Sequence, residues 1–240
     1  MSQHITRKEL KHDRVAETLV HGAEAVVSHQ GTIWLWAGVA ALVLAAVFGW
    51  RFYSERQTLK ASAALEDAMK VFNARIRMPG EAEEPGEITY VAETNKFEDA
   101  AKKFTGVAEK YGRTQPGAVA RYYAGLSYEL QGRNDEAEKW LRQSTSSSYS
   151  EVAALGKFQL AGVLSKQGKN EEAANLYKQL MASPTLFVPK PVVMLALAEH
   201  YAKTNPAEAT KLYNELKTDF PNTAVAEEAE KQLEKLGPKT

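Results

Sequence analysis

Two patterns of apolar and polar residues divide the chain, and the first is an uncharged run near its beginning. Residues 31–50 read GTIWLWAGVAALVLAAVFGW, without a charged side chain. At a rise of about 1.5 Å per residue, a helix of about 20 residues is roughly 30 Å long, which matches the hydrocarbon core of a bilayer. Aromatic residues flank the run at both ends: Trp34, Trp36, Trp50, Phe52 and Tyr53. Because such rings favour the two membrane interfaces, the pattern predicts a transmembrane helix over residues 31–53 rather than a buried soluble helix.

The span also carries small residues at every fourth position, namely Ala37, Ala41, Ala45 and Gly49. Such a stripe lets a second helix approach closely in lipid, so these four residues are candidates for contact with a neighbouring membrane helix. An anchor that is merely rich in alanine would look the same, and both interpretations stay open. No small-x-small cleavage site follows the run, which favours a retained anchor over a cleaved signal peptide.

The segment before the span, residues 1–30, predicts an amphipathic helix over residues 5–29 that lies on the membrane or docks a cytoplasmic partner. It holds four histidines, His4, His12, His21 and His29. None of them are four positions apart, so no metal site is predicted. Basic residues do not orient the chain, because four lie in residues 1–32 and four in residues 51–70. A short head and a long tail favour a cytoplasmic head and an exported tail.

The second pattern, after residue 53, is a helical rhythm with intervals of 36 or 37 residues. Small residues recur and are each followed, four positions later, by a large one: Ala100 and Phe104, Ala137 and Leu141, Ala173 and Tyr177, Ala209 and Tyr213. Residues four apart share one face of a helix. The alanine then lets two helices approach, and the large residue fills the space between hairpins. The pattern predicts a helical hairpin that is used several times.

Two similar motifs lie at equivalent positions of this repeat: GRNDEA at residues 132–137 and GKNEEA at residues 168–173. We expect Gly132 and Gly168 to end the first helix of their hairpins in the left-handed conformation that glycine adopts easily. The Asn and acidic residues after each glycine are expected to start the second helix. In the next hairpin, Pro206 takes that starting role.

Helix pairs at a period of about 34 residues are typical of the tetratricopeptide repeat, and residues 124–141, AGLSYELQGRNDEAEKWL, resemble it most closely. Several residues stand where the repeat has them: Gly125, Tyr128, Gly132 and Ala137. The early Trp of the repeat is absent. The resemblance implies a tetratricopeptide-repeat α-solenoid over residues 54–240. With the transmembrane helix predicted from the apolar run, the expected fold is all-α.

Three irregular segments complete the predicted solenoid. Residues 59–76 favour a helix that continues out of the membrane helix. Residues 79–87, PGEAEEPGE, predict a mobile acidic loop, which is either an insertion between the first two helices or a ligand-binding segment. Residues 223–236 predict a charged capping helix, which the open end of a solenoid requires.

Composition excludes several classes of function. The 30 basic and 30 acidic residues cancel, so no nucleic-acid partner is expected, and the absence of cysteine excludes disulfides, thiolate metal sites and a cysteine nucleophile. No metalloprotease, phosphate-loop or nucleophile-elbow motif occurs. We therefore expect no enzyme and no cofactor. His200 stands where earlier hairpins have Tyr128 and Leu164, so we expect it to be a packed core residue.

The candidate binding surface is the concave face that the first helix of each hairpin would line. The residues predicted to line it recur at 36-residue steps or lie between them: Tyr122, Leu126, Glu129, Phe158, Ser165, Met194 and Tyr201. Aromatic and thioether side chains with polar neighbours suit an extended or helical peptide. The same stripe fits packing against the neighbouring helix equally well.

The order of these parts is similar to that of the YfgM family. The resemblance rests on the segment GWRFYSERQTLKASAALEDAM at residues 49–69 and on the divergent repeats after it. The resemblance implies a bacterial inner-membrane protein with a cytoplasmic N-terminus and a periplasmic repeat domain. It also implies association with the SecYEG translocon and the periplasmic chaperone PpiD, assisting exported proteins. The rival hypothesis is a structural scaffold subunit of a cell-envelope assembly, such as a pilus, secretion or cell-division machine. The sequence leaves the oligomeric state open.

Overall fold

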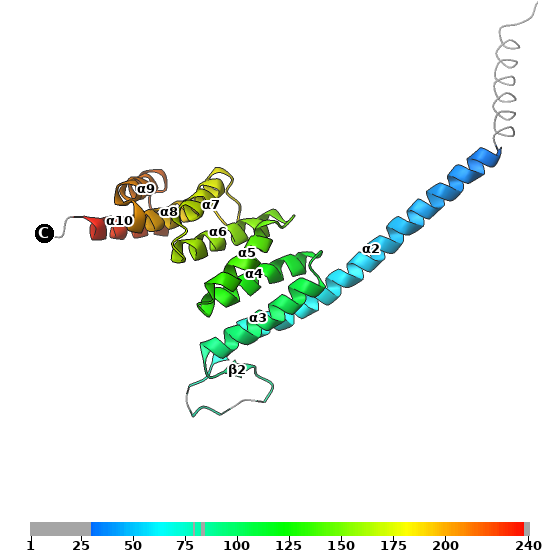
Figure 1. Ribbon diagram of the computed structural model, residues 1–240, viewed down its shortest axis with the longest axis horizontal. Coiled ribbons are helices and arrows are strands. Elements are labelled where there is room, and N and C mark those ends of the chain that lie inside the picture. Colours follow the sequence, from blue (N-terminus) through cyan, green and yellow to red (C-terminus); the bar gives the residue numbers. More distant parts are fainter. Residues whose placement is uncertain (1–29, 79, 83–84, 238–240) are drawn as a thin grey trace, which may run out of the picture. The chain divides into compact units, whose positions relative to one another are not determined.

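The computed structural model describes residues 30–78, 80–82 and 85–237 (Figure 1). The predicted head helix over residues 5–29, with its histidines, lies outside the described residues. The described part contains nine helices: α2 (Gln30–Phe72), α3 (Glu93–Lys110), α4 (Gln115–Leu130), α5 (Asn134–Thr145), α6 (Ser150–Lys166), α7 (Asn170–Ala182), α8 (Lys190–Thr204), α9 (Pro206–Asp219) and α10 (Ala224–Leu236). The chain divides into two compact units, one up to Glu55 and one from Arg56 onward.

In the first unit, α2 presents apolar side chains on every side. All residues from Trp34 to Glu55 are exposed, and Leu42 and Phe48 are 73% and 69% exposed. By length and composition, this helix is able to cross a membrane, a property that it shares with signal sequences. Small residues leave its surface open, since a Cβ built on Gly49 meets no atom within 4 Å.

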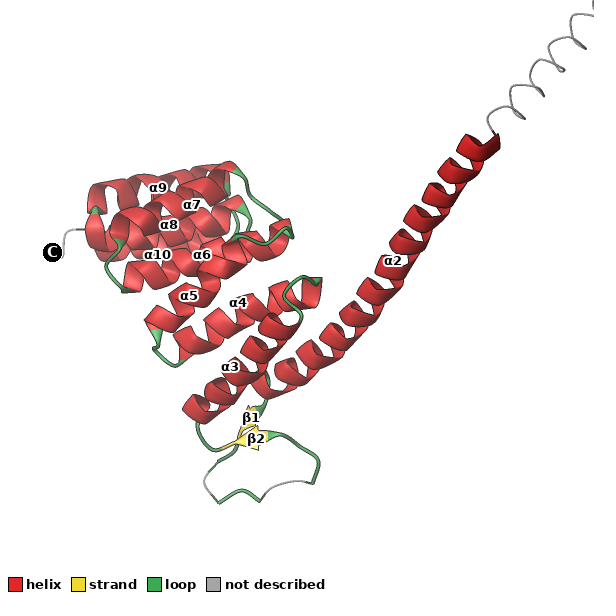
Figure 2. Ribbon diagram, turned by 45° about the vertical axis from the view of Figure 1, so that its right-hand side comes forward, coloured by secondary structure: helices red, strands yellow, loops and turns green. Residues whose placement is uncertain are grey.

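In the second unit, successive helices pack as antiparallel neighbours into hairpins, as Figure 2 shows. The predicted small residues lie in the core, where Ala100, Ala137, Ala173 and Ala209 are all 0% exposed. The large residues four positions later are also buried, at 5% exposure or less: Phe104, Leu141, Tyr177 and Tyr213. The repeating pair is therefore confirmed as the packing unit of an all-α solenoid.

The first hairpin is closed by aromatic rings that the end of α2 brings to α3 and α4. The ring centroid of Phe72 lies 5.5 Å from that of Phe97, 5.9 Å from Phe104 and 5.4 Å from Tyr123. Phe104 is 0% exposed, and burying such a side chain stabilises the fold by roughly 1.5–3 kcal/mol. The part of α2 from Arg56 to Phe72 thus serves as the first helix of the stack.

We call the turn between the two helices of a hairpin its elbow. Gly132 and Gly168 lie at two of these elbows and have the predicted left-handed backbone. Gly132 has φ 74° and Gly168 has φ 75°. After α4, the N–H of Arg133 donates to the carbonyl of Tyr128 at 2.9 Å, and the N–H of Gly132 donates to Glu129 at 2.8 Å. This pair of bonds satisfies the last carbonyls of the helix in a Schellman motif. The elbow after α6 has the same two bonds.

The next helix starts at the Asn and acidic residues, as predicted. Asn134 and Asn170 are the first residues of α5 and α7, but neither is the N-cap, and Arg133 and Lys169 hold that position without a side-chain cap bond. The acidic residues that follow lie in the first turn, where the helix dipole favours negative charge. At the third elbow, Pro206 begins α9 as predicted.

Residues 73–92 hold a small parallel strand pair that the sequence pattern did not indicate. The predicted helix over residues 59–76 ends at Phe72, and β1 (Arg75–Ile76) pairs with β2 (Thr89–Tyr90). The acidic segment lies between the two strands. Its Glu81 and Glu87 carboxylates pair with the Arg75 guanidinium, which ties the segment to β1.

The far end of the stack is closed by α10, as predicted. Thr223 is its N-cap, and its side chain accepts a hydrogen bond from the N–H of Ala226 at 3.2 Å. The helix packs on α9 and α8, where Ala229 is 0% exposed within the core.

Candidate functional site

Polar residues of the predicted binding stripe join one hairpin to the next. Glu129 of α4 accepts hydrogen bonds from Lys166 Nζ at 2.7 Å and from Gln159 Nε2, both on α6. Its side chain is only 8% exposed. Glu129 is therefore committed to an ion pair between hairpins, which leaves little of its carboxylate for a partner.

Ser165 and His200 form the equivalent link between α6 and α8. Ser165 Oγ lies 2.8 Å from His200 Nδ1, and His200 is 4% exposed. The rings of Tyr177 and Tyr201 lie beside the imidazole, with centroids 6.4 Å and 5.7 Å away. Burial lowers the pKa of His200, because a charged imidazolium loses its hydration there. His200 is a packed core residue, as the repeat frame predicted.

The apolar residues of the stripe divide into two groups. Tyr122, Leu126, Phe158 and Tyr201 are half-buried and keep part of their surface in solvent. Met194 is 1% exposed and packs within the core formed by α8, α9 and α10. The structure thus corrects the placement of Met194, because α10 closes over α8 at the end of the stack.

The pocket that contains Tyr122 lies between α4, α6 and the α7–α8 loop, which comprises residues 183–189. It has a volume of about 410 Å³. Ten residues line it: Gln115, Val119, Tyr122, Tyr123, Tyr149, Ser150, Glu151, Val152, Leu155 and Phe187. Burial raises the pKa of the Tyr122 hydroxyl, so its O–H stays a hydrogen-bond donor. We call these ten residues the aromatic pocket.

Sequence reasoning found only one residue of this pocket. Tyr149 and Phe187 lie outside the repeating helices, in the connections before α6 and before α8. The repeat frame therefore gave no signal for them. The available signal was the local run TLFVP at residues 185–189, in which three adjacent apolar residues cannot all face one core.

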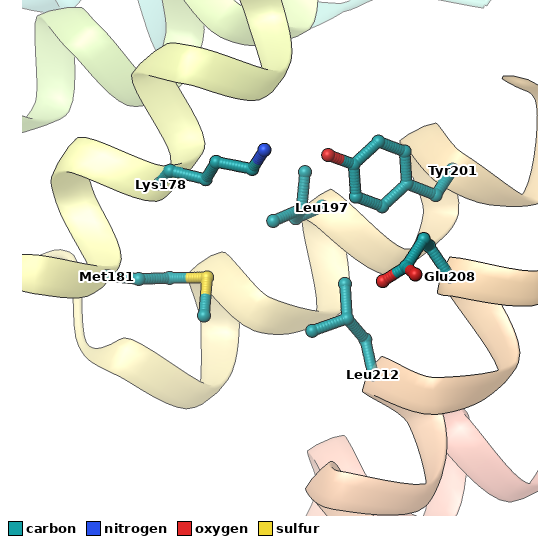
Figure 3. A pocket seen from close by; sticks show the side chains of 6 residues that line it. All are labelled: Lys178, Met181, Leu197, Tyr201, Glu208 and Leu212. Atoms are coloured by element: carbon teal, nitrogen blue, oxygen red, sulfur yellow. The ribbon is translucent and has the colours of Figure 1, made fainter. Parts of the chain in front are cut away.

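A second, smaller pocket of about 340 Å³ lies over α7, α8 and α9 (Figure 3). Its lining residues are Lys178, Met181, Leu197, Tyr201, Glu208 and Leu212. Figure 3 shows the ammonium of Lys178 and the hydroxyl of Tyr201 pointing toward each other, with Nζ 5.9 Å from the ring centroid. Tyr201 is the one residue of the predicted stripe in this pocket.

The four predicted membrane-helix contacts, Ala37, Ala41, Ala45 and Gly49, are all exposed on α2. Their surface is free in the described chain, as contact with a second helix would require. The contact itself stays a prediction.

The match to known families decides the class of the repeats. A family model described as a tetratricopeptide repeat-like domain matches residues 29–187. The chain belongs to this tetratricopeptide repeat-like family. Such domains are typically protein-interaction scaffolds without catalytic activity, and they mediate contacts between proteins.

Solved structures show the same fold. A crystal structure of the nearly identical tetratricopeptide repeat-like repeats of a putative kinesin light chain from Podosopora anserina matches with a TM-score of 0.52. It shares 14% sequence identity, and the match covers 74% of this chain and 93% of that chain. A crystal structure of a point variant of the same repeats matches with the same TM-score and identity, over 74% and 92%. At this identity the likeness shows the fold alone. No curated protein matches the chain.

Proposed function

We propose that this tetratricopeptide repeat-like protein is a membrane-anchored interaction adaptor, and that it serves as an ancillary subunit of the Sec translocon. In this proposal, α2 anchors the chain in a bacterial inner membrane, with the N-terminus in the cytoplasm. The repeat domain stands in the periplasm and acts with a periplasmic chaperone on exported proteins. No bond is made or broken.

One observation carries the anchoring part of the proposal. From Trp34 to Tyr53, α2 exposes apolar side chains all around its axis. A helix that is apolar on every side needs either a protein core or lipid around it. Within the described residues this stretch has no protein cover, so lipid is the surrounding that fits its surface.

The adaptor part is supported by the solenoid itself. The first helices of the hairpins join one another through the side-chain pairs Glu129–Lys166 and Ser165–His200. The aromatic pocket lies on two of these first helices, α4 and α6. The translocon association and the periplasmic location are proposed from the resemblance of residues 49–69 to the YfgM family.

The test is purification of the native complex from membranes in mild detergent. The proposal expects translocon subunits and a periplasmic chaperone to co-elute with the chain. A single stoichiometric partner from a pilus, secretion or cell-division assembly would replace the proposal with the structural-scaffold hypothesis.

The orientation has its own test. Protease added to right-side-out vesicles should degrade the repeat domain, and protease added to inverted vesicles should leave it intact. The opposite pattern would place the repeat domain in the cytoplasm and refute the periplasmic role.

A further inference from the structure

The aromatic pocket has a rim that is held in place before any partner binds. Glu151 of α6 accepts hydrogen bonds from the backbone N–H groups of Leu186 and Phe187, at 3.4 Å and 3.2 Å. Within the α7–α8 loop, the N–H of Thr185 donates to the carbonyl of Val188 at 3.1 Å, and the N–H of Val188 donates to Thr185 Oγ1 at 3.2 Å. Val188 is 2% exposed and anchors the loop in the core.

This fixed loop presents its two largest side chains to solvent. Leu186 is 82% exposed and Phe187 is 62% exposed. Leaving such side chains in water forgoes roughly 1.5–3 kcal/mol each relative to burial. Adjacent exposed apolar residues beside a pocket are typical of an interaction site. Because the loop is bonded in this position, its apolar residues would lose little conformational freedom when a partner covers them.

The charges of the pocket indicate what kind of partner fits it. Of the ten lining residues, Glu151 alone carries a charge. The Thr185 hydroxyl and the N–H groups of Phe187 and Leu186 bond its carboxylate and lower its pKa. The anion is thus already engaged by the loop. The remaining polar groups are hydroxyls and one amide, which bond to peptide backbone without preference for either sign of charge.

We propose that the aromatic pocket, together with the adjacent Leu186, binds an uncharged apolar stretch of unfolded polypeptide. A phenylalanine or leucine side chain of that stretch enters the pocket, and the flanking backbone lies against the tyrosine hydroxyls and Gln115. This inference rests on the proposed adaptor function and names the chemistry of its clients. A lipid surface is disfavoured, since a flat bilayer does not fill a concavity of about 410 Å³.

The test uses the full chain in detergent and a short fluorescent peptide of alternating phenylalanine, leucine and serine. Fluorescence anisotropy reports the affinity. Phe187→Ser removes an exposed anchor, and Gln115→Trp fills the pocket from an exposed rim position of α4. Each variant should weaken binding by about tenfold or more. Leu130→Ser is the matched control, because Leu130 is 49% exposed on α4 and does not line the pocket.

Two further comparisons define the chemistry. Peptides with lysine or glutamate in place of each phenylalanine should bind about tenfold or more weaker, and the affinity of the apolar peptide should change little with salt. Circular dichroism checks that each variant keeps its helix content, which surface substitutions should not alter.

Several outcomes would overturn the inference. The first is unchanged affinity in both Phe187→Ser and Gln115→Trp. The second is tighter binding of a charged peptide, and the third is a Phe187→Ser variant that loses only self-association. If any of these outcomes is found but the complex purified from membranes still contains translocon subunits, the adaptor proposal stands without this surface. If the peptide binds as expected but no translocon subunit co-elutes, the translocon proposal fails alone.

Discussion

Replacing Gly132 by alanine tests whether backbone conformation, rather than space, requires glycine at the elbow. Gly132 has φ 74°, and a Cβ built there meets no atom within 4 Å. The substitution therefore creates no clash. Its cost is the left-handed conformation, about 1–2 kcal/mol for an L-residue. The unfolded chain loses about 0.4–1 kcal/mol of entropy, which offsets part of that cost. We expect a net loss of about 1 kcal/mol in the free energy of unfolding.

The chain offers a matched control in Gly106, in the exposed interior of α3. A Cβ there also meets no atom within 4 Å, but the backbone is helical and φ is negative. Gly106→Ala should therefore gain about 1 kcal/mol, because alanine favours a helix interior. The same chemical change should move stability in opposite directions at the two sites, with a gap of about 2 kcal/mol.

The assay is urea unfolding of the full chain in detergent, followed by circular dichroism. With a slope of roughly 2 kcal/mol per molar, the two midpoints should differ by about 1 M. Gly132→Asn should lose less than Gly132→Ala, because Asn tolerates the left-handed region. If both alanine variants were stabilised alike, the elbow would not depend on the glycine conformation.

Four further predictions concern buried and charged groups. Leu141→Ala should cost about 2–5 kcal/mol in urea unfolding, because Leu141 is 0% exposed and its side chain packs against Gly125. A loss below about 1 kcal/mol would contradict the packing argument. Tyr213→Phe should leave stability unchanged or raise it by about 1 kcal/mol, because the buried Tyr213 hydroxyl has no hydrogen-bond partner among the described residues. A clear loss of stability would show that the hydroxyl is bonded. Burial lowers the pKa of His200, so its contribution to stability is complete above the unfolded pKa of about 6.5 and is lost as the pH falls below that value. His200→Leu copies Leu164 of the previous hairpin. In unfolding curves measured over a pH series, this variant should lose less stability than the parent chain below about pH 6.5. Arg142 joins α5 to α7, and its Nη1 lies 2.7 Å from a Glu172 carboxylate oxygen. Arg142→Ala should cost about 1 kcal/mol of stability at low salt and less at high salt. An equal cost at both salt concentrations would argue against an electrostatic link.

Much of the fold follows from properties that each short segment carries by itself. The left-handed conformation at Gly132 and Gly168 depends on the local backbone. The small and large residues four apart, such as Ala137 and Leu141, reflect the helical period. The apolar run over residues 31–50 depends on composition alone. None of these signals needs a distant part of the chain, which is why the sequence predicts the hairpins and the long apolar helix.

Other features depend on which segments meet in space. Glu129 looked like a free polar residue of a binding face, but Lys166 and Gln159, one hairpin later, engage its carboxylate. Residues 75–76 looked like the end of a helix, but they pair with a strand that begins at Thr89. Both outcomes are set by partners that no local pattern identifies.

What the sequence by itself determined is the repeating hairpin and the apolar anchor candidate, since helical period and glycine conformation are local. What only the tertiary structure decided is which equivalent positions remain accessible. Tyr122 and Met194 hold the same place in the repeat, yet Tyr122 lines a pocket while Met194 is 1% exposed beneath α10. Phe187, from a loop outside the repeat, completes that pocket. Burial is a property of neighbours, and neighbours are set only when the whole stack closes.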